Sequence, residues 1–149
     1  MRPFTTFNFK VNLQLEGDGG VICDAEFSEC AGLELSMEAK TLREGGNNGR
    51  QIHLAGPVSY GQLTLKRGMT GNFKLWQWFE QLQQDRRLRA SGEVLMLSSD
   101  RTAEDVRFVL SGCLPVKLKA PSLVAKDGAI AIEELQVLYE TLYLAAPEA

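Results

Sequence analysis

The sequence predicts a mainly β protein, a barrel or sandwich of antiparallel strands with one flanking α-helix. Short segments of alternating apolar and polar residues, separated by glycine clusters, recur along the chain and are typical of half-buried strands. Helical spacing of apolar residues occurs in one stretch, from Leu75 to Leu82. A chain of 149 residues has the size of one ordinary domain, so we expect a single domain over 1–149 with its own core.

The first strand has the clearest pattern. Every odd-numbered position from Phe7 to Leu15 is apolar, and every even-numbered position from Asn8 to Glu16 is polar. The glycine cluster at residues 17–20 predicts a turn, and residues 21–27 should form the returning strand of a hairpin.

A third strand is expected from Leu33 to Lys40. Its odd-numbered positions are apolar and its even-numbered positions are polar, so the polar side should face water or a lumen. The candidate lumen-facing residues are Glu34, Ser36, Glu38 and Lys40.

Residues 41–61 contain the glycine-rich stretch 45–49, then Pro57 and a further glycine, but no sustained apolar period, which predicts a long extended loop. Loops of this length in a compact domain are usually functional or disordered. The segment either lacks fixed structure in the free subunit or is an arm that becomes ordered on a neighbouring molecule. The arm interpretation is favoured by side chains able to make contacts, and its candidate residues are Arg43, Glu44, Gly45, Gly46, Asn47, Asn48, Gly49 and Arg50.

A helix is predicted over about residues 72–85, with Asn72 as its N-cap. Its apolar face should anchor it across a sheet, because large aromatic rings dominate core burial. The anchor residues are Leu75, Trp76, Trp78, Phe79 and Leu82. Stacking of the tryptophan rings on a ligand is the alternative, and the polar side of the helix is either a solvated face or a docking surface.

After the helix, residues 93–97 and 106–110 predict another hairpin, and Gly112 and Pro115 predict a bend. Residues 130–144 should form one long strand, with a bulge at Glu133 and Glu134 where the alternation breaks. This strand is apolar on both faces, so we expect another subunit to cover part of it.

The charges argue against several classes of protein. Sixteen basic and 19 acidic residues give a net charge of −3, the wrong sign for a surface that neutralises phosphates. No apolar run approaches the length needed to span a bilayer, and no signal-peptide core follows Met1, so synthesis in the cytoplasm is expected.

The acidic residues are concentrated at residues 16–44, where eight acidic and two basic side chains give −6. The rest of the chain is therefore +3. This asymmetry either has no function or suits a molecule whose acidic side meets the basic side of the next copy.

We find no residues arranged for catalysis, metal binding or a cofactor. The three cysteines form no Cys-x-x-Cys pair, and His53 has no second histidine or cysteine at ligand spacing. Glu133 and Glu134 are neighbours that would point to opposite faces of a strand. The sequence therefore predicts a protein that is not an enzyme, with no catalytic residues, no metal site and no cofactor.

Three blocks of the sequence resemble the tail-tube protein family of contractile phages and extracellular contractile injection systems. They are Arg43 to Asn48, Leu63 to Gly68 with Leu75 to Phe79 following, and Leu114 to Lys117 with Ile132 to Leu142. Their order and spacing cover most of the chain. Leu118, where relatives often have tryptophan, and Tyr139, where many have histidine, depart from the family pattern.

The resemblance implies a structural inner-tube subunit that closes into six-fold rings, which stack into a hollow tube inside a contractile sheath. The implied partners are other copies of the chain, a sheath protein, baseplate or tube-initiator proteins, cap proteins and a payload of protein or DNA in the lumen. The tube would belong to an assembled phage tail or an extracellular particle. The resemblance also implies that the 41–61 segment contacts a neighbouring subunit or ring.

Two other functions stay open at this stage. One is a tube-initiating or baseplate adaptor paralogue, or a type VI secretion-like tube protein, of the same fold. The other is a monomeric β-barrel module that binds a small ligand.

Overall fold

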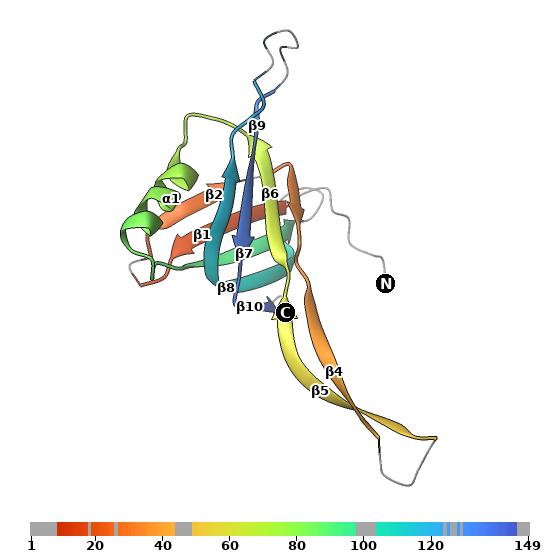
Figure 1. Ribbon diagram of the computed structural model, residues 1–149. Coiled ribbons are helices and arrows are strands. Elements are labelled where there is room, and N and C mark those ends of the chain that lie inside the picture. Colours follow the sequence, from red (N-terminus) through yellow and green to blue (C-terminus); the bar gives the residue numbers. More distant parts are fainter. Residues whose placement is uncertain are drawn as a thin grey trace.

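The computed structural model describes residues 9–17, 19–25, 27–43, 49–97, 104–123, 125, 128 and 130–145. Within these residues the chain forms ten strands and one helix (Figure 1). In order they are β1 (Phe9–Leu15), β2 (Val21–Ala25), β3 (Glu29–Ala31), β4 (Leu35–Arg43), β5 (Gln51–Tyr60), β6 (Gln62–Gly68), α1 (Lys74–Gln84), β7 (Ala90–Leu97), β8 (Glu104–Lys119), β9 (Ile132–Leu138) and β10 (Thr141–Ala145).

The strands of the body form two crossed layers joined by the long strand β8. The order of pairing is β2-β1-β7-β8-β9-β6-β3, with β10 also on β8, and every pair is antiparallel. The first half of β8 pairs with β7 and β10, and its second half pairs with β9. The sheet does not close on itself, so the mainly β prediction with a single helix is confirmed as a sandwich and not as a barrel.

The transfer of β8 between layers depends on the residues at which a bend was predicted. Gly112 has a φ of +62°, a backbone conformation that residues with a Cβ rarely adopt. Pro115 lacks an N–H to donate, and the pairing of β8 with β9 shifts register between Pro115 and Lys117. The chain bends here, but the strand continues to Lys119.

Two predictions about the C-terminal segment are wrong. Residues 130–144 form two strands, because the chain breaks at Tyr139 and Glu140 and the Glu140 amide donates to the Ser111 carbonyl at 2.8 Å. The predicted bulge at Glu133 and Glu134 is absent, since β9 pairs with β6 in unbroken register from Ile132 to Leu138. Glu133 points into the core and interrupts the apolar pattern without disturbing the backbone.

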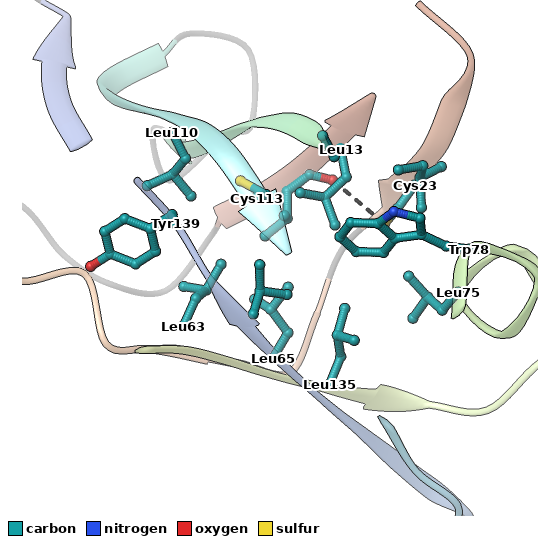
Figure 2. Close-up of a cluster of buried hydrophobic side chains, with 14 of the residues drawn as sticks. Leu13, Cys23, Leu63, Leu65, Leu75, Trp78, Leu110, Cys113, Leu135 and Tyr139 are labelled. Carbon is teal, nitrogen blue, oxygen red and sulfur yellow. Dashed lines mark hydrogen bonds between the residues drawn. The ribbon is translucent and has the colours of Figure 1, made fainter. Parts of the chain in front are cut away.

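The helix packs beside β2 and β8, and Leu75 and Trp78 carry its contact with the core (Figure 2). Both side chains are only 1% exposed, whereas Trp76, Phe79 and Leu82 are half-buried. The N-cap is Phe73 and not Asn72 as predicted. The Asn72 side chain still accepts a hydrogen bond from the Lys74 amide at 3.1 Å, because it lies one residue before the cap.

A buried ion pair ties the helix to the sheet. Arg67 of β6 and Glu133 of β9 are 7% and 2% exposed, and the Arg67 Nε lies 2.6 Å from the Glu133 Oε1. The other Glu133 oxygen accepts a hydrogen bond from the Trp76 indole at 3.2 Å. The Arg67 guanidinium also lies over the Phe27 ring, 5.4 Å from its centre. One buried carboxylate therefore holds two strands and the start of the helix together.

Candidate assembly surface

The predicted loop at 41–61 is instead most of an antiparallel hairpin formed by β4 and β5. This hairpin is a separate two-stranded sheet that projects from the sandwich (Figure 1). The loop prediction is wrong because a strand pair with no core to cover needs no regular apolar period. All nine residues of β4 are exposed, and the strand is held by its backbone pairing with β5.

The base of the hairpin is fixed by Tyr139, which follows β9. Its hydroxyl donates to the Gly32 carbonyl at 2.7 Å and accepts from the Glu34 amide at 3.1 Å. Its ring lies 5.8 Å from the Tyr60 ring, centre to centre. The Gly61 amide donates to the Glu34 carbonyl at 3.0 Å and completes the junction. The position of the hairpin relative to the sandwich is therefore set by a buried side chain.

The apolar residues of the hairpin lie on different local faces at its base and near its tip. At the base, Leu35 pairs with Tyr60 and Met37 with Val58, which places these side chains on one face. Nearer the tip, Leu42 pairs with Ile52, and Lys40 with Leu54, on the other face.

A register shift between Met37 and Ala39 separates these two regions. Gly56 lies opposite this shift, where a Cβ would come within 2.0 Å of the Glu38 carbonyl oxygen. This close approach of two backbones requires glycine at residue 56.

More than half of the surface of several of these apolar side chains is exposed to solvent. Leu35, Met37 and Leu42 are 59%, 55% and 52% exposed. A two-stranded hairpin is marginally stable in water by itself, and grouped exposed apolar residues usually mark a binding surface. The hairpin is thus a candidate binding surface.

Three of the residues predicted as an intersubunit contact lie at the far end of this hairpin. Arg43 ends β4, and Gly49 and Arg50 precede β5. The predicted contact residues Glu44, Gly45, Gly46, Asn47 and Asn48 lie outside the described residues.

The candidate lumen-facing residues also lie on or beside the hairpin. Ser36, Glu38 and Lys40 are exposed on β4, and Glu34 is exposed just before it. Ser36 and Ser59 share a hydrogen bond of 2.9 Å across the strand pair. These side chains are therefore not part of the sandwich wall.

The described residues contain no group of three or more histidine, cysteine, aspartate or glutamate side chains that could hold a metal ion. Burial raises the pKa of the Cys30 thiol to about 11. Burial, with smaller effects of Glu16 and Glu140, raises the pKa of the Cys113 thiol to about 12. Both thiols are thus kept protonated and unreactive at neutral pH. His53 is exposed on β5, where its Nδ1 lies 3.5 Å from the Thr41 hydroxyl.

The one helix in the described part of the chain is too short and too polar to cross a bilayer.

Comparison with known families decides which assembly this is. The model of the T4-like virus tail tube protein gp19 family matches residues 5–143. The chain belongs to this tail-tube family. The tail-tube hairpin, and all of the sandwich except the last two residues of β10, lie inside the matched range. No curated protein sequence matches the chain.

Solved structures of contractile injection systems share the fold of this tail-tube chain. A chain in the six-fold symmetrised baseplate of the anti-feeding prophage is 25% identical, with a TM-score of 0.83, covering 98% of this chain and 97% of that one. A chain in the extended sheath–tube complex of the PVC extracellular contractile injection system is 20% identical, with a TM-score of 0.82, covering 97% and 93%. Hcp1 from Flavobacterium johnsoniae is more distant, at 15% identity and a TM-score of 0.52, covering 93% and 96%.

Sequence reasoning missed two sets of residues that position the tail-tube surfaces. Tyr139 fixes the hairpin base, whereas the sequence predicted that it lies inside one long strand from residue 130 to residue 144. The burial of the Arg67–Glu133 pair was not predicted, because a charged residue in a strand normally indicates the solvent face. Both sets depend on contacts between residues more than 60 positions apart.

Proposed function

We propose that this chain is the structural inner-tube subunit of a phage tail-like contractile injection apparatus. Its copies would form six-fold rings that stack into a rigid hollow conduit. The observation that carries the proposal is the projecting β4–β5 hairpin, whose apolar residues are exposed in the single chain. Membership of the tail-tube family and the six-fold symmetry of the anti-feeding prophage baseplate support it.

In this proposal the hairpin of one subunit contacts a neighbouring subunit or ring. Binding would bury Leu35, Met37 and Leu42 and would supply the partner that the strand pair lacks. The contact would then also include residues 43–50, of which Arg43, Gly49 and Arg50 lie at the far end of the described hairpin. Head-to-tail contacts that close give rings, and contacts that do not close give filaments. A tube of stacked rings therefore needs one set of contacts within each ring and a second set between successive rings.

The function is mechanical and involves no catalysis. The tube would be built on a baseplate, ended by a cap and enclosed by a sheath, whose contraction drives it with its payload of protein or DNA through the target envelope. These partners are consistent with the sheath–tube, baseplate and cap structures that share the fold. The chain would be made in a bacterial cytoplasm before the particle is assembled.

Electron microscopy and the molar mass in solution test this proposal. We expect rings or tubes, either from the purified chain or when a matching baseplate is supplied as a template. A chain that stays monomeric even on that template would contradict the proposal.

A tube-initiating paralogue is the second candidate, because one related fold is a chain of a baseplate structure. Such a protein would form a single ring and stop, so the microscopy that tests the tube also separates these two functions.

A further inference from the structure

A groove of about 270 Å³ lies between the helix α1 and the strand β2, on the side of the sandwich away from the β4–β5 hairpin (Figure 1). Its lining includes Val21 and Ile22 on the strand side and Lys74, Gln77, Trp78 and Gln81 on the helix side. Pockets for small molecules usually have volumes of roughly 300–1,000 Å³. This groove is therefore better suited to part of a longer chain that lies along it than to a small ligand.

The strand side of the groove is a free sheet edge. β2 is the last strand of its layer, and within the described residues it pairs with β1 alone. Val21, at the start of β2, is 50% exposed, whereas Ile22 is part of the core. Unpaired strand edges accept a further strand, and the addition of an extended segment to a sheet edge is a common mode of recognition. The β2 edge thus favours an extended partner segment with an apolar side chain for Val21.

The helix side of the groove offers polar groups that are not in use. Three exposed side chains follow one another along this face of α1, namely Lys74, Gln77 and Gln81. None of the three has a hydrogen bond or ion pair from its side chain in the described part of the chain. A glutamine amide both donates and accepts, so it can bond to the backbone of an extended segment.

A buried donor without an acceptor borders the same groove. Trp78 is 1% exposed, and its indole N–H has no partner among the described residues. A buried donor that is left unpaired lowers stability. A carbonyl oxygen of a bound segment would give this indole an acceptor.

The groove is positively charged where α1 begins. Lys74 is the first residue of the helix, and the first turn has no acidic residue. A helix N-terminus has a partial positive charge, which adds to the charge of the Lys74 ammonium group. The acidic side chain of β2, Asp24, already pairs with Lys10 at 2.8 Å. A carboxylate of a partner would therefore be favoured next to Lys74.

We infer that an extended segment of the sheath protein, with an apolar side chain and a carboxylate, adds to the free edge of β2 and lies in this groove. This inference rests on the proposed function, because it requires a tube enclosed by a sheath. The hairpin lies on another side of the molecule, so it can contact other copies while the groove stays open (Figure 1). Every subunit has this groove, and the sheath meets subunits along the whole tube, whereas a baseplate or a cap meets only its ends.

A peptide of the inferred chemistry tests the groove in the folded free chain. The probe is acetyl-Glu-Val-Thr-Val-Thr-Val-Glu-amide, with a carboxylate at each end so that either strand direction is allowed. The control peptide has lysine in place of both glutamates. We expect the glutamate peptide to shift the amide resonances of β2 and of residues 74–81, and the indole resonance of Trp78, in ¹H–¹⁵N spectra.

Variants of one lysine make this test specific. Lys74→Glu should weaken binding of the glutamate peptide about tenfold or more, because like charges then meet in the groove. Lys74→Arg should retain binding. Arg87→Glu is the matched control, since it makes the same charge change at a side chain that is 96% exposed beyond the other end of α1. A peptide that leaves β2 unshifted, or that binds Lys74→Glu as tightly as the wild type, would overturn the inference.

Co-assembly with the sheath protein of the same particle tests the source of the segment. Lys74→Glu should form tubes as readily as the wild type, because glutamate is favoured in the first turn of a helix. The fraction of its tubes that are enclosed by sheath, counted by electron microscopy, should fall about tenfold or more, whereas Arg87→Glu tubes should be enclosed normally. Normal enclosure of Lys74→Glu tubes would overturn the assignment to the sheath. Failure of the wild-type chain to form tubes on a baseplate would instead count against the proposed function.

Discussion

β6 and β4 are both strands of this chain, yet they are held in different ways. In β6, Leu63, Leu65 and Arg67 point into the core and alternate with half-buried or exposed residues. In β4 no residue is buried, although the strand is longer than β6. The sandwich is thus stabilised by burial within one chain, whereas the hairpin has only its backbone pairing and its base. The sandwich therefore carries the stability of the subunit, and in our proposal the hairpin provides a contact for assembly.

We expect the largest loss of stability when the largest buried side chain of the sandwich is truncated. Trp78→Ala should lower the free energy of unfolding by about 3–5 kcal/mol, because it leaves a cavity in the core. Denaturant unfolding measures the loss. Trp78→Phe is the matched control and should cost much less, since it keeps a ring and loses an indole N–H that has no partner among the described residues. A variant Trp78→Ala that melts like the wild type would place this ring outside the core.

The buried carboxylate gives the next largest effect. Glu133→Ala should cost about 3–5 kcal/mol, because it leaves the Arg67 guanidinium buried without its partner. Glu133→Gln keeps one acceptor oxygen, for either Arg67 or Trp76, and should cost less. Chemical denaturation measures both losses, and equal stability of Glu133→Ala and wild type would contradict the role assigned to this pair.

Substitutions in the hairpin should affect assembly and leave the stability of the subunit nearly unchanged. Replacing both Leu42 and Leu54 with serine should change the free energy of unfolding by no more than about 0.5 kcal/mol, because both side chains are already exposed. The same variant should fail to form tubes, as seen by electron microscopy. Replacement of Thr41 and Gln51, on the other face of the same strands, with serine is the control. A strongly destabilised leucine variant would show that the hairpin is part of the folding unit.

The last effect is confined to alkaline pH and to the sandwich. The pKa of the Cys113 thiol is raised above its ordinary value of 9.0 to about 12, so the folded protein keeps a proton that the unfolded chain loses. Its contribution is fully present below pH 9 and is lost as the pH rises towards about 12. Between pH 8 and pH 10.5 the wild type should therefore lose more stability than Cys113→Ala. Urea unfolding at these two pH values measures the free energy of unfolding of both proteins. If the wild type and Cys113→Ala lose the same amount, this role for Cys113 is excluded.

The limits of sequence reasoning follow from the same contrast. Alternation located β1, β2 and β7 because one side of each strand faces the core. It could not locate β5, where Leu54 and Val58 are exposed and Gly56 is required by a register shift. The tail-tube resemblance was readable in short blocks of sequence. The row of alternating charge from Lys119 of β8 through Glu134 and Lys66 to Glu29 of β3 was not readable, because it exists only after four strands have paired.

Hydrogen exchange of the backbone amides, compared between the free chain and assembled tubes, tests the central claim most directly. In the free chain, amides of β4 and β5 should exchange much faster than those of β6 and β9, because a hairpin without a core opens locally. In tubes the β4 and β5 amides should become strongly protected, while the core strands change little. Hairpin amides that are as protected as the core in the free chain, or that stay unprotected in tubes, would contradict the account.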